Sequence, residues 1–200
     1  MFYLLTGGSA CGKSTYAESL VCCYGQPRIY IATMQPYGED GQRKIARHRK
    51  MRATKGFETI EAQKDVADVS VPEEATVLLE CICNLASNEM FDEQGNMRDI
   101  RQKVIDGVLG LAGRCANLVV VTNELGAEYH DYDDFTPVYV EAVGYINRAL
   151  AAEADRVYEL VCGIPIAIKG DLPDFEGVAG YGGVPLGGLR GMPASEGGSD

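Results

Sequence analysis

The sequence has only two histidines and seven cysteines, and no two of these cysteines form a Cys-x-x-Cys pair. A zinc site built from Cys and His therefore lacks its usual ligand spacing. An odd number of cysteines also argues against a disulfide framework. We expect a protein of the reducing cytoplasm in which most cysteines serve as small core residues.

Basic charge and long apolar runs are also scarce. The chain carries 18 Lys and Arg against 29 Asp and Glu, a net charge of -11 at pH 7, which argues against a general nucleic-acid-binding protein. No apolar run approaches membrane-spanning length, and we expect neither a membrane span nor a signal peptide. The 200 residues, 46% of them hydrophobic, suit one globular domain with a substantial core.

A phosphate-binding motif stands near the start of the chain. Gly-Gly-Ser-Ala-Cys-Gly-Lys-Ser follows the apolar run 2–6 and precedes a helix-like segment, as expected for Gly-x-x-x-x-Gly-Lys-Ser. The alternative, a chance glycine-rich turn, does not account for this setting. Backbone N–H groups of such a loop close around phosphate oxygens, and the following helix adds its positive dipole end. We expect a nucleoside triphosphate to be bound by Gly7, Gly8, Ser9, Ala10, Cys11, Gly12, Lys13 and Ser14, with the Ser14 hydroxyl on Mg²⁺.

Strand-like and helix-like segments alternate along the chain. Apolar strand-like runs lie at 2–6, 28–33, 76–80, 118–122 and 157–161, and helix-like segments at 13–23, about 38–52, about 97–114 and about 138–153. This alternation predicts an α/β fold of the P-loop NTPase type, with a mainly parallel sheet flanked by helices. A turn at Cys162 and Gly163 predicts that residues 164–168 return as an antiparallel edge strand.

The composition changes after Lys169. Residues 171–200 are rich in glycine, contain three prolines and show little periodic apolar pattern. We therefore expect residues 1–170 to form the nucleotide-binding catalytic domain and residues 171–200 to be a mobile tail. The alternative is a tail that folds over the site on binding, through Tyr181 and Leu186.

Two acidic residues follow predicted central strands. Glu80 ends the run Val-Leu-Leu-Glu, and a carboxylate there can hold Mg²⁺ directly or through water. Glu124 follows the next strand at the same, carboxyl, edge of the sheet, where ligands collect in α/β proteins. Glu124 is a candidate general base or substrate contact, and a helix N-cap is the alternative.

The segment 42–52 is basic and contains no acid, although the chain as a whole is acidic. At helical spacing Lys44, His48 and Arg52 share one face. Neighbouring cations disfavour the charged imidazolium, so a neutral His48 is available to attack a phosphorus atom while arginines hold the oxygens. From spacing alone, a phosphate contact and a solvated surface histidine remain open as alternatives.

These motifs together resemble one family, the bifunctional adenosylcobinamide kinase / adenosylcobinamide-phosphate guanylyltransferases of cobalamin biosynthesis. The resemblance runs from about residue 1 to 169. It rests on the phosphate loop, Tyr-Ile-Ala-Thr at 30–33, His-Arg-x-x-Arg at 48–52, Phe-Glu-Thr-Ile-Glu at 57–61, Leu-Leu-Glu-Cys-Ile at 78–82, Val-Thr-Asn-Glu-Leu-Gly at 121–126, the helix-like segment 147–155 and Val-Cys-Gly-Ile-Pro at 161–165.

The resemblance implies two reactions. A kinase step phosphorylates adenosylcobinamide from ATP or GTP, with Lys13 as a catalytic residue. A transferase step moves GMP from GTP to that phosphate through a covalent phosphoramidate on a histidine, which here is His48, and yields adenosyl-GDP-cobinamide. It also implies a homotrimer. Nucleotide contacts carry over to Ala32, Thr33, Met34, Arg49, Lys50, Met51, Arg52, Glu61 and Glu80.

The chain departs from the family pattern at three places. It has no tryptophan, although the family usually has one near position 57, and Ala53 stands where a proline is common. Residues 127–134 are acidic, and if this loop meets the corrinoid, handling of that substrate differs. Two alternatives therefore stay open: a small-molecule kinase without a covalent step, and a nucleotide-binding regulatory module.

Deletion of the tail tests the proposed domain boundary. Residues 171–200 contain few large apolar side chains to offset the entropy lost on ordering them. We expect the truncated protein to keep its melting temperature and its GTP-dependent labelling. A fall of several degrees would contradict the mobile tail, since roughly 1 kcal/mol shifts a domain of this size by about 2–4 °C.

Overall fold

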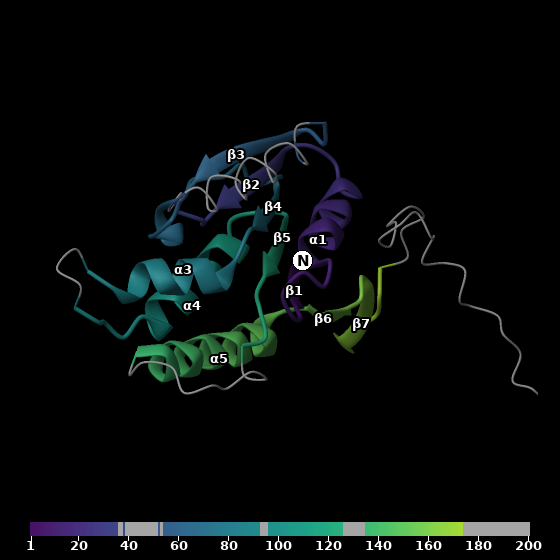
Figure 1. The fold of residues 1–200 in the computed structure, drawn as a ribbon. Helices are drawn as coiled ribbons and strands as arrows, with labels where there is room; N and C mark the ends of the chain where they lie inside the picture. The colour runs from purple at the N-terminus through teal and green to yellow at the C-terminus, as the bar shows by residue number, and fades with distance from the viewer. Residues whose placement is uncertain (36–37, 39–51, 53, 93–95, 126–134, 174–200) are drawn as a thin grey trace, which may run out of the picture.

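One seven-stranded sheet forms the centre of the protein. The computed structural model describes residues 1–35, 38, 52, 54–92, 96–125 and 135–173 (Figure 1). The sheet has the order β3-β2-β4-β5-β1-β6-β7. Its strands are β1 (Phe2–Thr6), β2 (Arg28–Ala32), β3 (Phe57–Glu61), β4 (Thr76–Leu79), β5 (Asn117–Val121), β6 (Arg156–Val161) and β7 (Ile164–Lys169).

Six strands run parallel, so their carboxyl ends meet at one edge of the sheet. β1 lies between β5 and β6, and β2 lies between β3 and β4. β7 pairs antiparallel with β6 across a turn at Cys162 and Gly163, both with positive φ. The predicted α/β fold, the mainly parallel sheet and the antiparallel edge strand are therefore confirmed.

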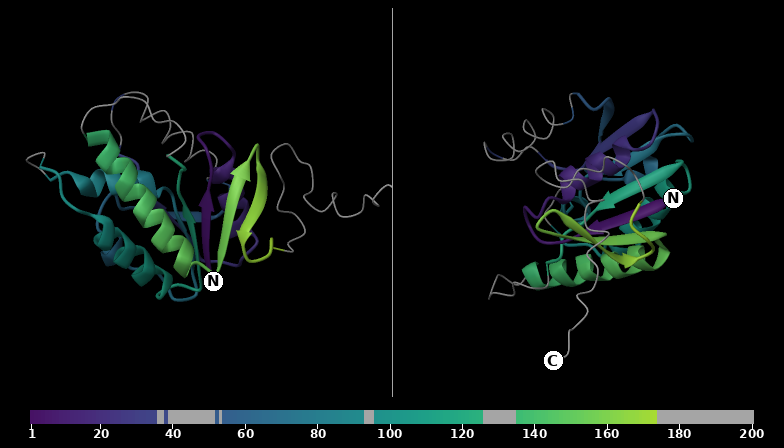
Figure 2. Two further views of the ribbon diagram at one scale, coloured as in Figure 1. Left: turned by 90° about the horizontal axis from the view of Figure 1, so that it is seen from below. Right: turned by 90° about the vertical axis from the view of Figure 1, so that its right-hand side faces the viewer.

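The helices divide between the two faces of the sheet (Figures 1 and 2). Helix α1 (Lys13–Cys22) covers one face, where Leu20 and Val21 pack on aromatic residues of the strands. On the other face lie α3 (Ile82–Met90), α4 (Arg101–Ala112), α5 (Phe135–Glu153) and the short 3-10 helix η1 (Val66–Asp68). Burial on both faces explains the continuous apolar runs of β4 and β5.

The connections that follow β1 and β5 indicate where a ligand-binding site lies on the sheet. These strands are neighbours, yet the helix that follows β1 packs on one face and the helix that follows β5 packs on the other. At the carboxyl edge the two connections therefore leave toward opposite faces of the sheet. A point where neighbouring connections change face in this way is where α/β sheets bind ligands.

Three of the described elements, β3, η1 and α3, were not predicted from the sequence. β3 is an edge strand with exposed acids, and α3 is a short helix whose N-cap, Cys81, makes no side-chain cap hydrogen bond. The predicted helix at 97–114 is α4, which begins only at Arg101. Most of the predicted helix at 38–52 falls outside the described residues.

The first residues of the predicted tail contact the folded domain. The carbonyl oxygen of Asp171 accepts hydrogen bonds from the Tyr158 hydroxyl, at 2.6 Å, and from the Arg156 guanidinium. Residues 174–200 lie outside the described part of the chain, so the mobile tail stays a prediction. Among the described helices, none has the length and apolar character that a membrane crossing requires.

A matched pair of leucine variants tests the packing of α1. The Leu20 side chain is fully buried beneath the sheet face, whereas Leu172 is 40% exposed. Leu20→Ala should lower the free energy of unfolding by about 2–5 kcal/mol, because it leaves a cavity. Leu172→Ala should change it by no more than about 0.5 kcal/mol. Urea denaturation of both variants measures the difference, and equal effects would contradict this account of the core.

Candidate active site

The loop after β1 approaches the neighbouring strand closely. Gly7 has a φ of 139°, and a Cβ there would lie 2.6 Å from the carbonyl oxygen of Leu160 in β6. Gly12, with a φ of 99°, immediately precedes α1 without a side-chain cap. The loop thus turns sharply at both ends, and the first N–H groups of α1 need partners. This is the backbone of an anion-binding site.

Lys13 lies at the centre of this loop. Its Nζ donates hydrogen bonds to the carbonyl oxygens of Gly7, at 2.8 Å, and Gly8, at 2.6 Å, and the side chain is only 6% exposed. The loop carbonyls hold the ammonium group beside the turn that begins α1. A fixed cation next to helix N–H groups stabilises negative charge on a phosphate.

Two neighbouring elements hold the phosphate loop. The N–H of Glu124, after β5, donates to the Gly7 carbonyl at 3.3 Å, and the N–H of Gly163 donates to the Cys11 carbonyl at 2.8 Å. The buried Thr122 hydroxyl donates to the Asn147 side chain of α5 at 2.7 Å. Glu124 itself is exposed, and α5 begins only at Phe135, so Glu124 does not cap that helix.

Glu80 binds the end of β2. Its Oε2 accepts hydrogen bonds from the N–H groups of Thr33, at 2.9 Å, and Met34, at 3.1 Å. The Thr33 hydroxyl donates to the Cys81 carbonyl at 3.1 Å. One half-buried carboxylate therefore fixes the backbone at two of the predicted nucleotide contacts.

Tyr30 and Arg52 extend this cluster. The Arg52 guanidinium carbon lies 3.4 Å from the centre of the Tyr30 ring, and the Arg52 side chain is 5% exposed. Its Nε and Nη1 atoms have no hydrogen-bond partner among the described residues. Burial and the nearby charge of Glu80 raise the pKa of Tyr30 well above its ordinary value, so the phenol stays neutral. Two buried, unpaired N–H donors are costly unless they bind an acceptor.

Two cysteines begin α3 at the same edge. A hydrogen bond from Cys81 lowers the pKa of the Cys83 thiol below its ordinary value. Cys83 is buried, and its Sγ lies 4.0 Å from the Thr122 hydroxyl. Of the seven cysteines only Cys83 is buried, although Cys11, Cys23, Cys81 and Cys115 pack against the core clusters.

The structure gathers many of the predicted site residues along one edge. The phosphate loop follows β1, Ala32 ends β2 with Thr33 directly after it, and Glu61 ends β3 opposite Ala32. Thr33 is buried, Met34 half-buried and Glu61 exposed. Four of the predicted site residues lie outside the described part of the chain, namely His48, Arg49, Lys50 and Met51. The sequence analysis did not identify Asn88 and Asn147 as side chains that anchor these loops. A single polar residue on a helix has no sequence pattern that marks such a role.

Comparison with known proteins matches these observations. The model of a family described as cobinamide kinase / cobinamide phosphate guanyltransferase, CobU, matches residues 3–168. The chain is 32% identical to the bifunctional adenosylcobalamin biosynthesis protein CobU of Escherichia coli and 31% to that of Salmonella typhimurium, covering 84% of this chain and 100% of each relative. It is 28% identical to CobP of Pseudomonas aeruginosa, covering 84% of this chain and 97% of the relative.

Two neighbouring glycines test the close approach of the loop. Gly7→Ala places a Cβ against the Leu160 carbonyl in a strained backbone conformation, whereas a Cβ at Gly8 meets nothing within 4 Å. Gly7→Ala should lower the free energy of unfolding by about 2 kcal/mol or more. Gly8→Ala should leave it within about 0.5 kcal/mol of wild type. Similar unfolding curves for the two variants would refute the close approach.

Proposed function

This chain belongs to the CobU family of cobinamide kinase / cobinamide phosphate guanyltransferases, and from that premise we propose its two reactions and their residues. In the first, adenosylcobinamide is phosphorylated from ATP or GTP. In the second, GMP passes from GTP to adenosylcobinamide phosphate by way of His48. The observation that carries the proposal is the Lys13 ammonium, which the carbonyls of Gly7 and Gly8 fix at the start of α1.

The kinase step uses the phosphate loop. The hydroxyl oxygen of the corrinoid's aminopropanol arm attacks the γ-phosphorus, the bond to the β,γ-bridging oxygen breaks, and the hydroxyl proton is released. Lys13 and the N–H groups that open α1 stabilise the charge on the transferred group and on the departing diphosphate. Positioning of the triphosphate is the protein's main contribution to this reaction.

The transferase step has two displacements. The neutral His48 nitrogen attacks the α-phosphorus of GTP, and pyrophosphate leaves. A phosphate oxygen of adenosylcobinamide phosphate then attacks the same phosphorus, and the histidine nitrogen leaves with its electron pair. The buried, unpaired donors of Arg52 support a role in neutralising phosphate charge. Arg49, Lys50 and Met51 complete the proposed contacts of this segment.

Mg²⁺ is the metal that the resemblance implies, and the donor set fits it in part. Ser14 opens α1 beside Lys13, and a hydroxyl at this position is an oxygen ligand of the kind Mg²⁺ takes. Glu80 already accepts two backbone hydrogen bonds through Oε2. We therefore assign Ser14 as a direct ligand and Glu80 as a contact through its other oxygen or through water. When bound, Mg²⁺ neutralises charge on the phosphate oxygens.

The remaining contacts follow the carboxyl edge of the sheet. We propose that Ala32, Thr33, Met34 and Glu61 contact the nucleotide, because the paired ends of β2 and β3 place them along the edge on which the phosphate loop lies. If the acidic segment 127–134 meets the corrinoid, handling of that substrate differs from that of the family. The resemblance also supports a homotrimer, which would place sites between subunits.

Labelling from GTP tests the covalent step. A phosphoramidate bond breaks in acid and survives base, unlike a serine or cysteine ester. With GTP labelled at the α-phosphate, we expect label on the denatured protein that resists base and is lost in acid. His48→Ala should abolish it. The control is His130→Ala, which removes the only other histidine and should label normally.

The same variants separate the alternatives. Full labelling of His48→Ala would overturn the assignment, and no labelling of the wild-type protein would favour a kinase without a covalent step. Lys13→Ala should impair both reactions, whereas folded His48→Ala should retain corrinoid-dependent phosphoryl transfer. Absence of corrinoid-dependent nucleotide consumption in the wild-type protein would favour a regulatory module.

A further inference from the structure

Asn88 of α3 joins the loops that follow two neighbouring strands. Its Nδ2 donates one hydrogen bond to the Thr33 carbonyl, at 2.8 Å, and one to the Gln63 carbonyl, at 2.9 Å. Thr33 comes directly after β2, and Gln63 comes two residues after β3. A single amide nitrogen thus uses both of its hydrogens to tie together the ends of β2 and β3.

We propose that Asn88 is a positioning residue for the nucleotide, through the ends of β2 and β3, where Thr33 and Met34 follow β2 and Glu61 is the last residue of β3. This inference rests on the proposed function, because those three residues are proposed nucleotide contacts. Asn88 does not belong to the phosphate loop. It acts only through the backbone carbonyls of Thr33 and Gln63, to which it donates hydrogen bonds.

Thr33 is held through all three of its polar groups. Its N–H donates to Glu80, its hydroxyl donates to the Cys81 carbonyl, and its carbonyl accepts from Asn88. Glu80 and Cys81 precede α3, and Asn88 lies near the far end of that helix. Thr33 is therefore hydrogen-bonded to residues at both ends of α3. Because the helix is rigid, the positions of these hydrogen-bond partners relative to one another are fixed.

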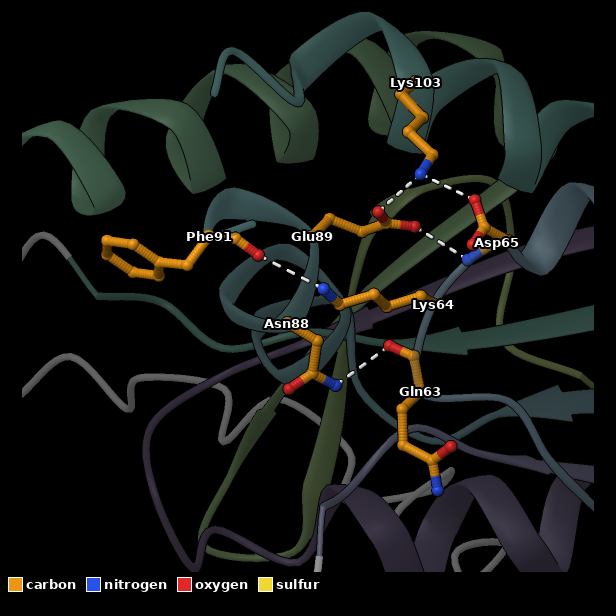
Figure 3. Close-up of polar contacts among 7 residues, drawn as sticks. All are labelled: Gln63, Lys64, Asp65, Asn88, Glu89, Phe91 and Lys103. Carbon is orange, nitrogen blue, oxygen red and sulfur yellow. Dashed lines mark hydrogen bonds and ion pairs between the residues drawn. The ribbon is translucent and has the colours of Figure 1, made fainter. Parts of the chain in front are cut away.

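The loop after β3 is held by the same end of α3 (Figure 3). The next helix residue, Glu89, accepts a hydrogen bond from the Asp65 N–H at 2.7 Å and pairs with Lys103 of α4 at 2.6 Å. Lys103 also pairs with the Asp65 carboxylate at 2.6 Å. Asp65 has a positive φ of 54°, an uncommon conformation that these contacts maintain.

Such anchoring affects binding through pre-organisation. A loop that is ordered before the nucleotide arrives loses little entropy on binding, whereas a freed loop must be ordered at that moment. Asn88→Leu removes both donors and leaves two carbonyls without their partner. We expect the Kd for GTP to rise about tenfold, which corresponds to about 1.4 kcal/mol of binding free energy.

The kinetic readout distinguishes positioning from chemistry. In phosphoryl transfer to adenosylcobinamide, Asn88→Leu should raise KM for the nucleotide about tenfold and leave kcat within about twofold, because Lys13 and the phosphate loop are untouched. Asn88→Asp should give a pH dependence of GTP affinity that a general loss of protein stability would not produce. Its carboxylate faces two carbonyls at neutral pH, but its protonated form donates one hydrogen bond. GTP affinity of this variant, relative to wild type at the same pH, should therefore improve as pH falls from 8 to about 5.5.

Lys103→Met is the matched control, because it removes only the ion pairs to Asp65 and Glu89. The Asp65 N–H bond to Glu89 and both hydrogen bonds of Asn88 stay in place. It should lower the melting temperature and leave the Kd for GTP within about twofold. The inference is overturned by an unchanged Kd in Asn88→Leu, by an equal rise in Lys103→Met at equal loss of stability, or by no recovery of Asn88→Asp at low pH.

Lys13→Ala separates this inference from the proposed function, with GTP binding measured by calorimetry. If Lys13→Ala loses GTP binding while Asn88→Leu keeps it, only the role of Asn88 is wrong. If Lys13→Ala binds GTP like the wild type, the proposed nucleotide site itself is wrong.

Discussion

At the carboxyl end of β1 the backbone runs so close to β6 that no side chain fits between them. Gly7 meets this constraint, with its Cα facing the Leu160 carbonyl. The peptide oxygen of Gly7 then becomes an acceptor for both the Lys13 ammonium and the N–H of Glu124. Because the strand, the phosphate loop and the β5 loop meet at this one peptide, the position of Lys13 depends on it.

The other loops of the edge are held by polar side chains from the helices. Asn88 of α3 binds the loops after β2 and β3, and Asn147 of α5 binds the loop after β5. Glu80, between β4 and α3, binds the N–H groups at the end of β2. Irregular backbone at a buried edge needs hydrogen-bond partners, and here amide and carboxylate side chains supply them. The same contacts order the candidate site before a ligand binds.

Much of the architecture could be predicted from local patterns. The apolar runs of β4 and β5 indicate strands buried on both faces, and the Gly-Lys-Ser motif places the phosphate loop at the end of β1. β3 escaped prediction because an edge strand with exposed acids shows no clear apolar period. α3 escaped because it is short and its polar residues, such as Asn88, form contacts that only the tertiary structure creates.

The site was predictable as a set of residue types rather than as a set of contacts. Glu80 was expected as a metal ligand, and that role stays a proposal. The structure shows in addition that it binds Thr33 and Met34, which lie 47 and 46 residues away in sequence. Separations of this size leave no local pattern. Likewise, Arg52 of the basic segment packs against Tyr30 of β2, which lies 22 positions earlier in the sequence. Only the fold brings these two residues together.

Hydrogen–deuterium exchange with and without GTP and Mg²⁺ tests most directly the claim that the nucleotide binds across this edge. The account predicts slower exchange on binding at the phosphate loop, while amides already bonded in the free protein, such as those of Thr33 and Met34, change little. Slower exchange confined to α4 and α5, with none at residues 7–14, would contradict it.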